Sequence, residues 1–193
     1  MTLQIIEGTK RKLYKRKPRT FKPRNQAKKA LKQKKKRKTQ IDLWREWLVP
    51  DGAKRRYKGL RGIYWYWLSR DVRKTEWEKW GGLCLTCLNP IEDWRMADCG
   101  HIVASRWCGE YLRFNRKNLT IQHKGCNNPR FCPQAGVLNA VNIDKRHGDG
   151  YMDMLLSLVK KECKEPGQEE YRQLIRDLPS YQEALSNTHQ SQG

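Results

Sequence analysis

The sequence contains no long hydrophobic run, and this absence limits the classes of protein that it can encode. Near the N-terminus, the apolar stretch Leu3–Ile6 is too short to form the core of a signal peptide. No stretch has the roughly 20 consecutive apolar residues that a membrane-spanning helix needs. We therefore expect a protein that is neither secreted nor embedded in a membrane.

Acidic residues are also scarce, because 20 Asp and Glu stand against 41 Lys and Arg, and the net charge is +21. Residues 1–40 hold 17 of the basic residues and a single acid, Glu7. So little apolar surface cannot offset the entropy of ordering, so we expect residues 1–38 to be disordered in isolation. The charge predicts a polyanionic partner, most simply nucleic acid, although a solubilising or targeting role is the alternative. The residues expected to contact phosphates there are Lys34, Lys35, Lys36, Arg37 and Lys38.

The seven cysteines are an odd number with no obvious disulfide spacing, which favours a reducing cytoplasm and metal ligation. Cys84 and Cys87 form one pair of soft ligands, and His123 and Cys126 form a second pair with the same spacing. Together they predict a four-ligand tetrahedral zinc site. Cys132 remains an alternative to His123 as the fourth ligand, and so does His101.

Hard ligands lie inside and beside this predicted zinc site. Asp98 precedes Cys99-Gly-His101, and Asn127 directly follows Cys126. Carboxylate and amide oxygens are the donors that Mg²⁺ or Mn²⁺ prefers. The layout therefore predicts zinc as scaffold and a second, harder cation as catalyst. Asn128 is the alternative to Asn127 as a ligand of this second cation. Asn127 could instead cap the following helix.

The order Cys-x-x-Cys, Gly-His, Asn and Cys-Asn-x-x-basic resembles that of the HNH, or ββα-metal, nucleases. Over roughly residues 60–160, which include Leu112-Arg-Phe-Asn-Arg-Lys-Asn118, the chain is similar to the phage Rap/NinG recombination endonucleases. The resemblance implies an α+β fold with a small zinc-stapled ββα-metal core, surrounded by α-helices and preceded by a basic extended or helical arm. His123 departs from the family's usual cysteine, and Asn127 replaces the His of many HNH enzymes.

The same resemblance implies a metal-dependent endonuclease that hydrolyses phosphodiester bonds in branched recombination intermediates, such as Holliday junctions and D-loops. His101 then matches the general base, Asp98 and Asn127 the ligands of the catalytic ion, and Asn118 the residue that fixes the loop and orients the base. The basic residues expected to hold phosphates near them are Arg113, Arg116, Lys117 and Arg130.

Two other functions stay open from the sequence. One is a non-enzymatic zinc-containing nucleic-acid-binding protein, and the other is an HNH nuclease without branch specificity. The expected partner is DNA, with no membrane. A homodimer, or a recombination or single-strand-binding protein as partner, is compatible with this function. The expected location is the cytoplasm, that of a bacterial host if the protein is phage-encoded.

Local patterns divide the chain into a helical region (39–80), the zinc-bound nuclease core (81–148), C-terminal helices (149–185) and a flexible tail (186–193). Thr39 and Asp42 predict a capping box for a short helix with one apolar face, ended by Pro50. A longer helix is predicted over Gly59–Trp80, where an aromatic stripe favours core packing over base stacking.

Within the core, Trp94–Asp98 and Cys99–Val103 are predicted to be short β segments. The following helix begins either at Asn127 or beyond Pro133, because a proline inside a helix removes a hydrogen bond. Apolar spacing predicts two further packing helices, near Tyr151–Val159 with Asp149 as cap and near Tyr171–Leu178.

Overall fold

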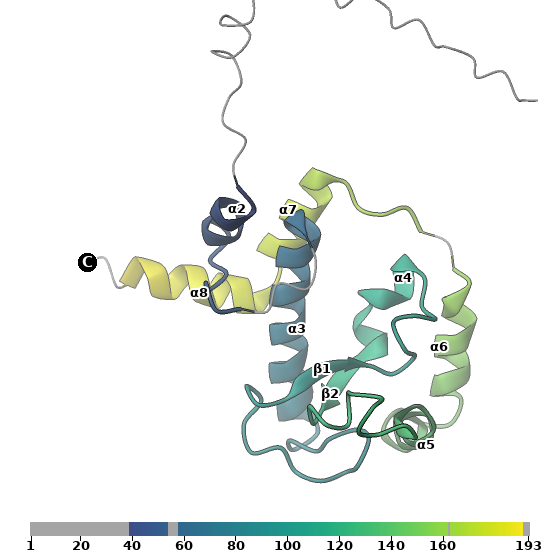
Figure 1. Cartoon of the computed structure of the whole chain (residues 1–193). Coiled ribbons are helices and arrows are strands. Elements are labelled where there is room, and N and C mark those ends of the chain that lie inside the picture. The colour runs from purple at the N-terminus through teal and green to yellow at the C-terminus, as the bar shows by residue number, and fades with distance from the viewer. Residues whose placement is uncertain (1–38, 54–57, 162, 191–193) are drawn as a thin grey trace, which may run out of the picture. The chain divides into compact units, whose positions relative to one another are not determined.

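The computed structural model describes residues 39–53, 58–161 and 163–190, which belong to one compact unit (Figure 1). The predicted basic arm, including Lys34–Lys38, lies outside the described residues. The predicted α+β class is confirmed, and none of the described helices is long and apolar enough to cross a bilayer. The elements are α2 (Gln40–Glu46), α3 (Gly59–Lys79), β1 (Asp98–His101), α4 (Glu110–Arg113), the 3₁₀ helix η1 (Arg116–Asn118), β2 (Leu119–Gln122), α5 (Ala135–His147), α6 (Tyr151–Val159), α7 (Gln168–Arg176) and α8 (Pro179–Gln190).

Helix α2 begins with the predicted capping box. The Thr39 hydroxyl accepts from the Asp42 N–H at 3.1 Å, and the Asp42 carboxylate accepts from the Thr39 N–H at 2.9 Å. The predicted apolar face is wrong in part: Trp44 is buried, but Ile41 is exposed. Leu48 lies beyond the helix at a φ of 55°, because α2 ends at Glu46 and the chain turns there.

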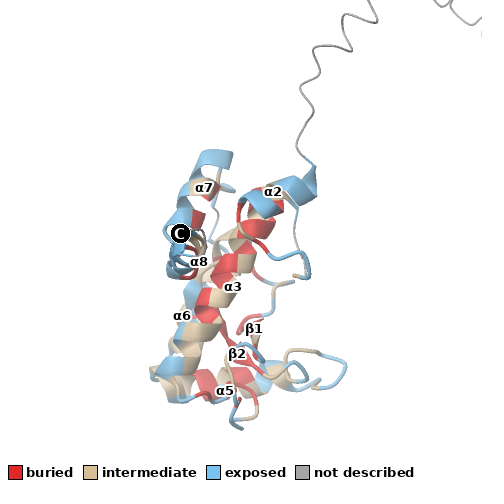
Figure 2. Ribbon diagram, turned by 90° about the vertical axis from the view of Figure 1, so that its left-hand side faces the viewer, coloured by how far each residue is buried: buried red, intermediate tan, exposed pale blue. Residues whose placement is uncertain are grey.

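Helix α3 is the element around which α2, α7, α8 and the two strands pack, whereas α6 packs against α4 and α5. The bounds of α3 agree with the predicted helix to within one residue, with Trp80 at the C-cap. It packs against α2, α7 and α8 and also against both strands, so it buries residues on more than one face (Figure 2). The aromatic stripe is core, as favoured above: Leu60, Trp67 and Leu68 are buried.

Strands β1 and β2 form an antiparallel pair in which Asp98 lies opposite Gln122 and His101 lies opposite Leu119. The β segment predicted to start at Trp94 is wrong, because residues 94–97 form a turn before β1. In this turn the Asp93 carboxylate accepts from the Arg95 N–H at 2.8 Å, and the Ala97 N–H donates to the Trp94 carbonyl. β1 itself ends at His101.

Helix α5 follows the two strands and begins beyond Pro133, which was one of the two predicted starts. Buried amides join it to the rest of the core. Asn139 Oδ1 accepts from the Thr86 hydroxyl at 2.8 Å and from Gln122 Nε2 at 3.1 Å. Asn142 Nδ2 donates to the Leu85 carbonyl at 2.8 Å. Such a satisfied network fixes one arrangement of α5, the sheet and the Thr86 loop.

The C-terminal region differs from the prediction in extent. Helix α6 begins as predicted, although Gly150 rather than Asp149 is its N-cap. Helix α8 continues to Gln190, so the expected flexible tail is helical over residues 186–190. The buried Asp71 of α3 fixes the N-terminus of α8. Its carboxylate accepts hydrogen bonds from the Ser180 N–H at 3.0 Å and from the Ser180 hydroxyl at 2.8 Å.

Candidate metal centre and active site

Two tight turns carry the four predicted zinc ligands. The first follows Gly82 at the end of α3, and its Leu88 N–H donates to the Cys84 carbonyl at 3.0 Å. The second follows β2, and its Asn127 N–H donates to the His123 carbonyl at 2.9 Å. A hydrogen bond from the Leu85 N–H to the Ile121 carbonyl (3.1 Å) joins the first turn to β2. The two turns therefore face each other.

The ligand atoms of Cys84, Cys87, His123 and Cys126 all lie within 4.8 Å of one another. Tetrahedral zinc with Zn–S bonds of about 2.3 Å requires sulfurs about 3.8 Å apart, so this spacing fits. Three thiols and one imidazole are a donor set of structural zinc sites. The cluster could therefore hold a structural metal ion such as zinc. Among the described residues it includes His123, and not Cys132 or His101.

Neighbouring groups already orient His123 and perturb the thiols of this cluster, in which Cys84 is buried and the other three ligands are partly exposed. His123 Nε2 lies 3.2 Å from the Pro90 carbonyl, to which it can only donate, so Nδ1 faces the Cys87 sulfur at 3.3 Å. Burial raises the pKa of Cys84, but backbone N–H groups, including that of His123, lower it to about 7 overall. Burial and the adjacent thiols raise the pKa of Cys126 to about 12. A metal must therefore displace thiol protons when it binds.

The second turn brings Asn127 against β1. Asn127 Nδ2 donates to Asp98 Oδ2 at 3.2 Å, so the structure brings together the two predicted ligands of the hard cation. Asn127 is not a helix cap, because the N-cap of α5 is Gln134. The alternative ligand, Asn128, accepts from the Arg130 N–H at 3.0 Å within the same turn.

Gly100 explains how closely this turn approaches the strand. A Cβ atom at this position would collide with the Gln122 side-chain amide and would lie 3.1 Å from Asn127 Oδ1. Gln122 cannot move aside easily, because it is buried and bonded to Thr86 and Asn139. The face of β1 that carries Asp98 therefore requires glycine at position 100.

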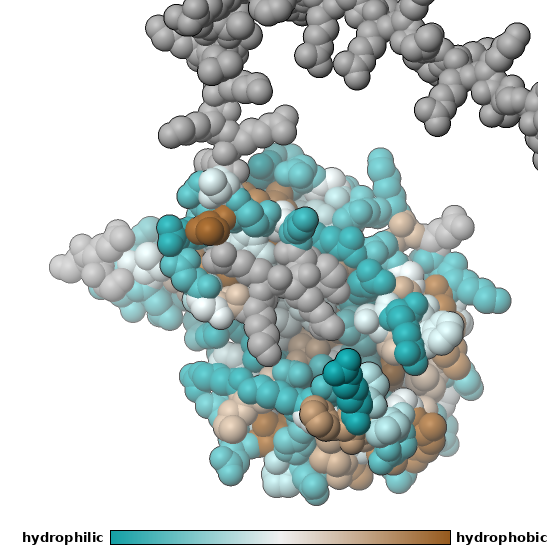
Figure 3. All heavy atoms as spheres, in the orientation of Figure 1, coloured by the Kyte–Doolittle hydropathy of each residue, from teal (hydrophilic) through white to brown (hydrophobic). Residues whose placement is uncertain are grey.

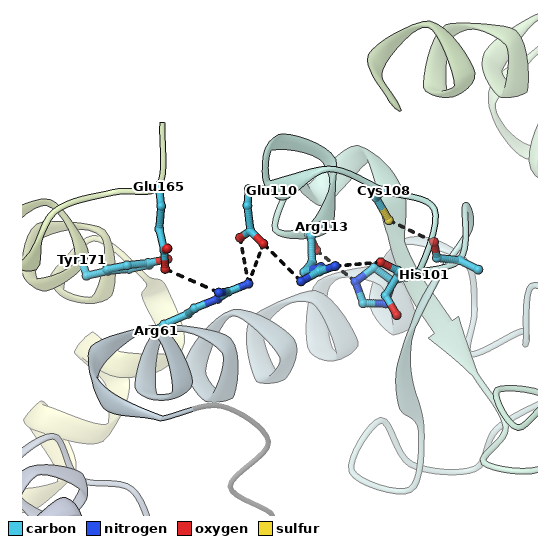
Figure 4. A network of polar contacts seen from close by, with 9 residues as sticks. Arg61, His101, Cys108, Glu110, Arg113, Glu165 and Tyr171 are labelled. Carbon is cyan, nitrogen blue, oxygen red and sulfur yellow. Dashed lines mark hydrogen bonds and ion pairs between the residues drawn. The ribbon is translucent and has the colours of Figure 1, made fainter. Parts of the chain in front are cut away.

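His101 lies on the opposite face of β1 from Asp98, because three positions along a strand reverse the side-chain direction. Its ring stacks on Trp65 with centroids 5.4 Å apart and an interplanar angle of 7°. Nε2 lies 3.0 Å from the Arg113 carbonyl (Figure 4). A carbonyl can only accept, so Nε2 donates in this contact and carries the proton.

Asn118 is fully buried and holds the chain that follows His101. Its Oδ1 accepts from the Val103 N–H at 2.7 Å, and its Nδ2 donates to the Val103 carbonyl at 3.1 Å. Its own carbonyl accepts from the Ile102 N–H at 2.9 Å. Asn118 thus fixes the two residues after His101 and acts on the site through the backbone.

A cleft of about 920 Å³ opens beside Asp98 and Asn127. Cationic side chains and aromatic rings line it, including the stacking partner of His101; the residues are Trp65, Arg73, Arg95, Lys124 and Phe131. Phe131 is 78% exposed. The face of the protein seen in Figure 3 carries hydrophilic side chains, with hydrophobic ones gathered toward its lower part. A cleft with oxygen ligands, positive charge and an exposed ring suits a phosphate ester that carries a planar base.

The four basic residues predicted to bind phosphates divide into two groups. Arg113 pairs with Glu110 at 3.2 Å, and Arg116 pairs with the buried Asp71. Both guanidinium groups therefore stabilise the fold. Lys117 and Arg130 are exposed.

Sequence reasoning missed the cations that line the cleft. Arg70 and Arg73 are three residues apart in the predicted helix, so the sequence already placed two cations on one face of it. Only packing reveals their position: Arg73 donates to the carbonyls of Arg95 (3.4 Å) and Ala97 (3.3 Å), which fastens the turn before β1 to α3.

Comparison with known proteins found no match: no protein-family model, no curated protein and no solved structure matches the chain.

Proposed function

We propose that the protein is a metal-dependent DNA endonuclease of the HNH type. The observation that carries the proposal is the contact between Asp98 and Asn127, made by a turn that the cysteine-histidine cluster fixes, on the strand that ends at His101. The chain order β1, β2, α5 is the order of a ββα-metal core and supports the same proposal. Branched recombination DNA is the proposed substrate, on the basis of the sequence resemblance.

The donor chemistry suggests a role for each group. Mg²⁺ or Mn²⁺ held by Asp98 and Asn127 would supply positive charge beside the scissile phosphate. His101 takes a proton from the attacking water, whose oxygen bonds to phosphorus, and it must reach that water around the end of β1 because its ring lies on the face opposite Asp98. The bond from phosphorus to one deoxyribose oxygen breaks, and that oxygen takes up a proton from solvent. Arg95 and Lys124 hold the flanking phosphates.

A non-enzymatic zinc protein that binds nucleic acid is the second candidate. One observation favours it: the His101 ring points to the face of β1 opposite Asp98 and stacks on Trp65. The binder keeps the cationic cleft and the cysteine-histidine cluster, and gives Asp98, His101 and Asn127 no catalytic role.

A cleavage assay separates the two candidates. Labelled four-way junction and linear duplex are incubated with the protein and Mg²⁺, Mn²⁺ or a chelator. The proposed nuclease nicks the junction, and His101→Ala loses about 10²-fold or more of the rate at unchanged DNA binding, because a positioned base contributes that much. His189→Ala, an exposed histidine on α8, is the matched control and retains activity. Tight binding without any nicking by the wild-type protein supports the binder instead.

A further inference from the structure

Three guanidinium groups converge on one indole ring beside the cleft. The Arg70, Arg73 and Arg95 carbons lie 4.8, 5.7 and 5.0 Å from the centroid of Trp94. Arg70 and Arg73 come from adjacent turns of α3, and Arg95 comes from the same turn as Trp94 itself. We call these four residues the Trp94 cluster.

The three arginines differ in how far the fold already uses them. Arg73 is the anchor: its Nε donates to the Ser69 carbonyl at 3.1 Å, and its Nη1 donates to the turn before β1. Arg95 pairs with Asp93 at 2.9 Å, but its side chain is 68% exposed. Arg70 stacks on the indole and is partly exposed. The N–H groups of Arg70 and Arg95 are therefore the ones available to a ligand.

Holding three like charges on one ring is unfavourable unless something offsets their repulsion. The π face of Trp94 and the Asp93 carboxylate, which pairs with Arg95 at 2.9 Å, do so in part. Burial lowers the pKa of Arg73; the nearby Cys99 raises it, and the neighbouring Arg70 lowers it, as expected for like charges. A bound anion would relieve the remaining repulsion, and a stacked guanidinium presents its N–H edge for bidentate contact with a phosphate.

We infer that the Trp94 cluster is a phosphate-binding site for the DNA strand that continues beyond the cleft. Arg73 and Arg95 line the cleft together with Asp98 and Asn127, so the cluster is continuous with the proposed catalytic site. A phosphodiester strand fits better than an acidic peptide, because it would supply phosphates to the hard-cation ligands and to the arginines at once. The inference rests on the proposed function in taking DNA as the occupant of the cleft.

DNA binding without cleavage tests the site directly. Labelled junction and duplex are titrated by fluorescence anisotropy with zinc-loaded protein and no added Mg²⁺ or Mn²⁺ over a range of salt, with wild-type protein, Arg70→Gln and Arg95→Gln. Each variant should lose affinity on both DNAs, and the slope of log K against log salt should fall by about one for each lost phosphate contact. Circular dichroism checks that both variants are folded.

Arg106→Gln is the matched control, because Arg106 also lies over a tryptophan, Trp107, at 5.5 Å but belongs to the loop after β1. It should bind as wild type. Wild-type slopes in both cluster variants would overturn the inference, and so would an equal loss in all three variants, which would reflect net charge alone. If the cluster variants lose the contact while the wild-type protein never cuts, the phosphate site stands and the nuclease fails. If the wild-type protein cuts DNA while both cluster variants bind DNA as the wild type does, the nuclease stands and the phosphate site fails.

Discussion

At the scale of single residues, the sequence predicted which residues belong to the candidate site but not the direction in which each side chain points. Asp98 and Asn127 are 29 positions apart and meet in one hydrogen bond. Ligand chemistry and spacing predicted both, together with the cysteine-histidine cluster. That His101 would stack on Trp65 could not be predicted, because this contact depends on how α3 packs against β1.

On the proposed function, the polar network of Figure 4 makes Glu110 a positioning residue for His101. The Glu110 carboxylate accepts twice from Arg61, at 2.8 Å each, and once from Arg113 at 3.2 Å. Arg113 in turn supplies the carbonyl that holds His101 Nε2. Glu110→Gln should therefore lower the cleavage rate roughly tenfold, because the base is held less well, and leave DNA affinity unchanged.

The pH profile separates this role from a merely structural one. Loosening the carbonyl contact should shift the pH dependence of the Glu110→Gln rate, whereas a partly unfolded enzyme keeps the profile at lower amplitude. Glu183→Gln, which breaks the exposed pair with Lys74, serves as control and should change neither quantity. A wild-type rate and profile for Glu110→Gln would show that the network does not act on His101.

At the scale of elements, local signals predicted the helices whose ends the sequence itself caps or breaks. The Thr39 capping box predicted the start of α2, and the bounds of α3 agree with the prediction to within one residue, whereas α2 ends at Glu46 and not at Pro50. Helix α8 escaped prediction because its N-terminus bonds to Asp71, which is 109 positions away. The turn at Trp94 was mistaken for a strand because Asp93 accepts the Arg95 N–H there.

Removal of a zinc ligand should unfold the core. His123→Ala should lose zinc, measured as one ion per chain in the wild-type protein by elemental analysis, and should lose helical circular dichroism. The reason is that roughly 10 kcal/mol of metal-binding free energy is coupled to folding in such sites. Cys132→Ser is the control and should keep zinc. A folded, zinc-replete His123→Ala protein would mean that another residue completes the site.

Asp71 should contribute more to stability than any exposed ion pair. Its carboxylate is buried, pairs with Arg116 and caps α8, so Asp71→Asn should lower the free energy of unfolding by about 3 kcal/mol. Urea denaturation measures this change. Asp51→Asn, whose pair with Arg45 is more than half exposed, should leave the urea midpoint close to that of the wild-type protein. Equal midpoints for the two variants would contradict the account of α8.

At the scale of the whole molecule, charge and site chemistry point to the same partner. The net charge of +21 predicted a polyanion, and the cleft places Arg73, Arg95 and Lys124 beside oxygen ligands suited to a hard cation. The basic arm, residues 1–38, holds 17 Lys and Arg, although it lies outside the described residues. On the proposed function, long-range charge would supply affinity and the cleft would supply chemistry.

Deletion of residues 1–38 should weaken DNA binding mainly at low salt. The slope of log K against log salt should fall by about 3 or more, since each lost phosphate contact contributes about 0.9. Anisotropy titrations over a range of salt concentrations measure it, with the intact chain as reference. An unchanged slope would show that the arm does not contact DNA.

The central claim is that a turn fixed by the cysteine-histidine cluster makes a hard-cation site from Asp98 and Asn127. Electron paramagnetic resonance of Mn²⁺ bound to zinc-loaded protein tests it most directly. We predict one Mn²⁺ site that Asp98→Ala and Asn127→Ala each abolish, and that Asp93→Ala, which alters the neighbouring turn, retains. Undiminished Mn²⁺ binding by folded, zinc-loaded Asp98→Ala and Asn127→Ala proteins would contradict the claim.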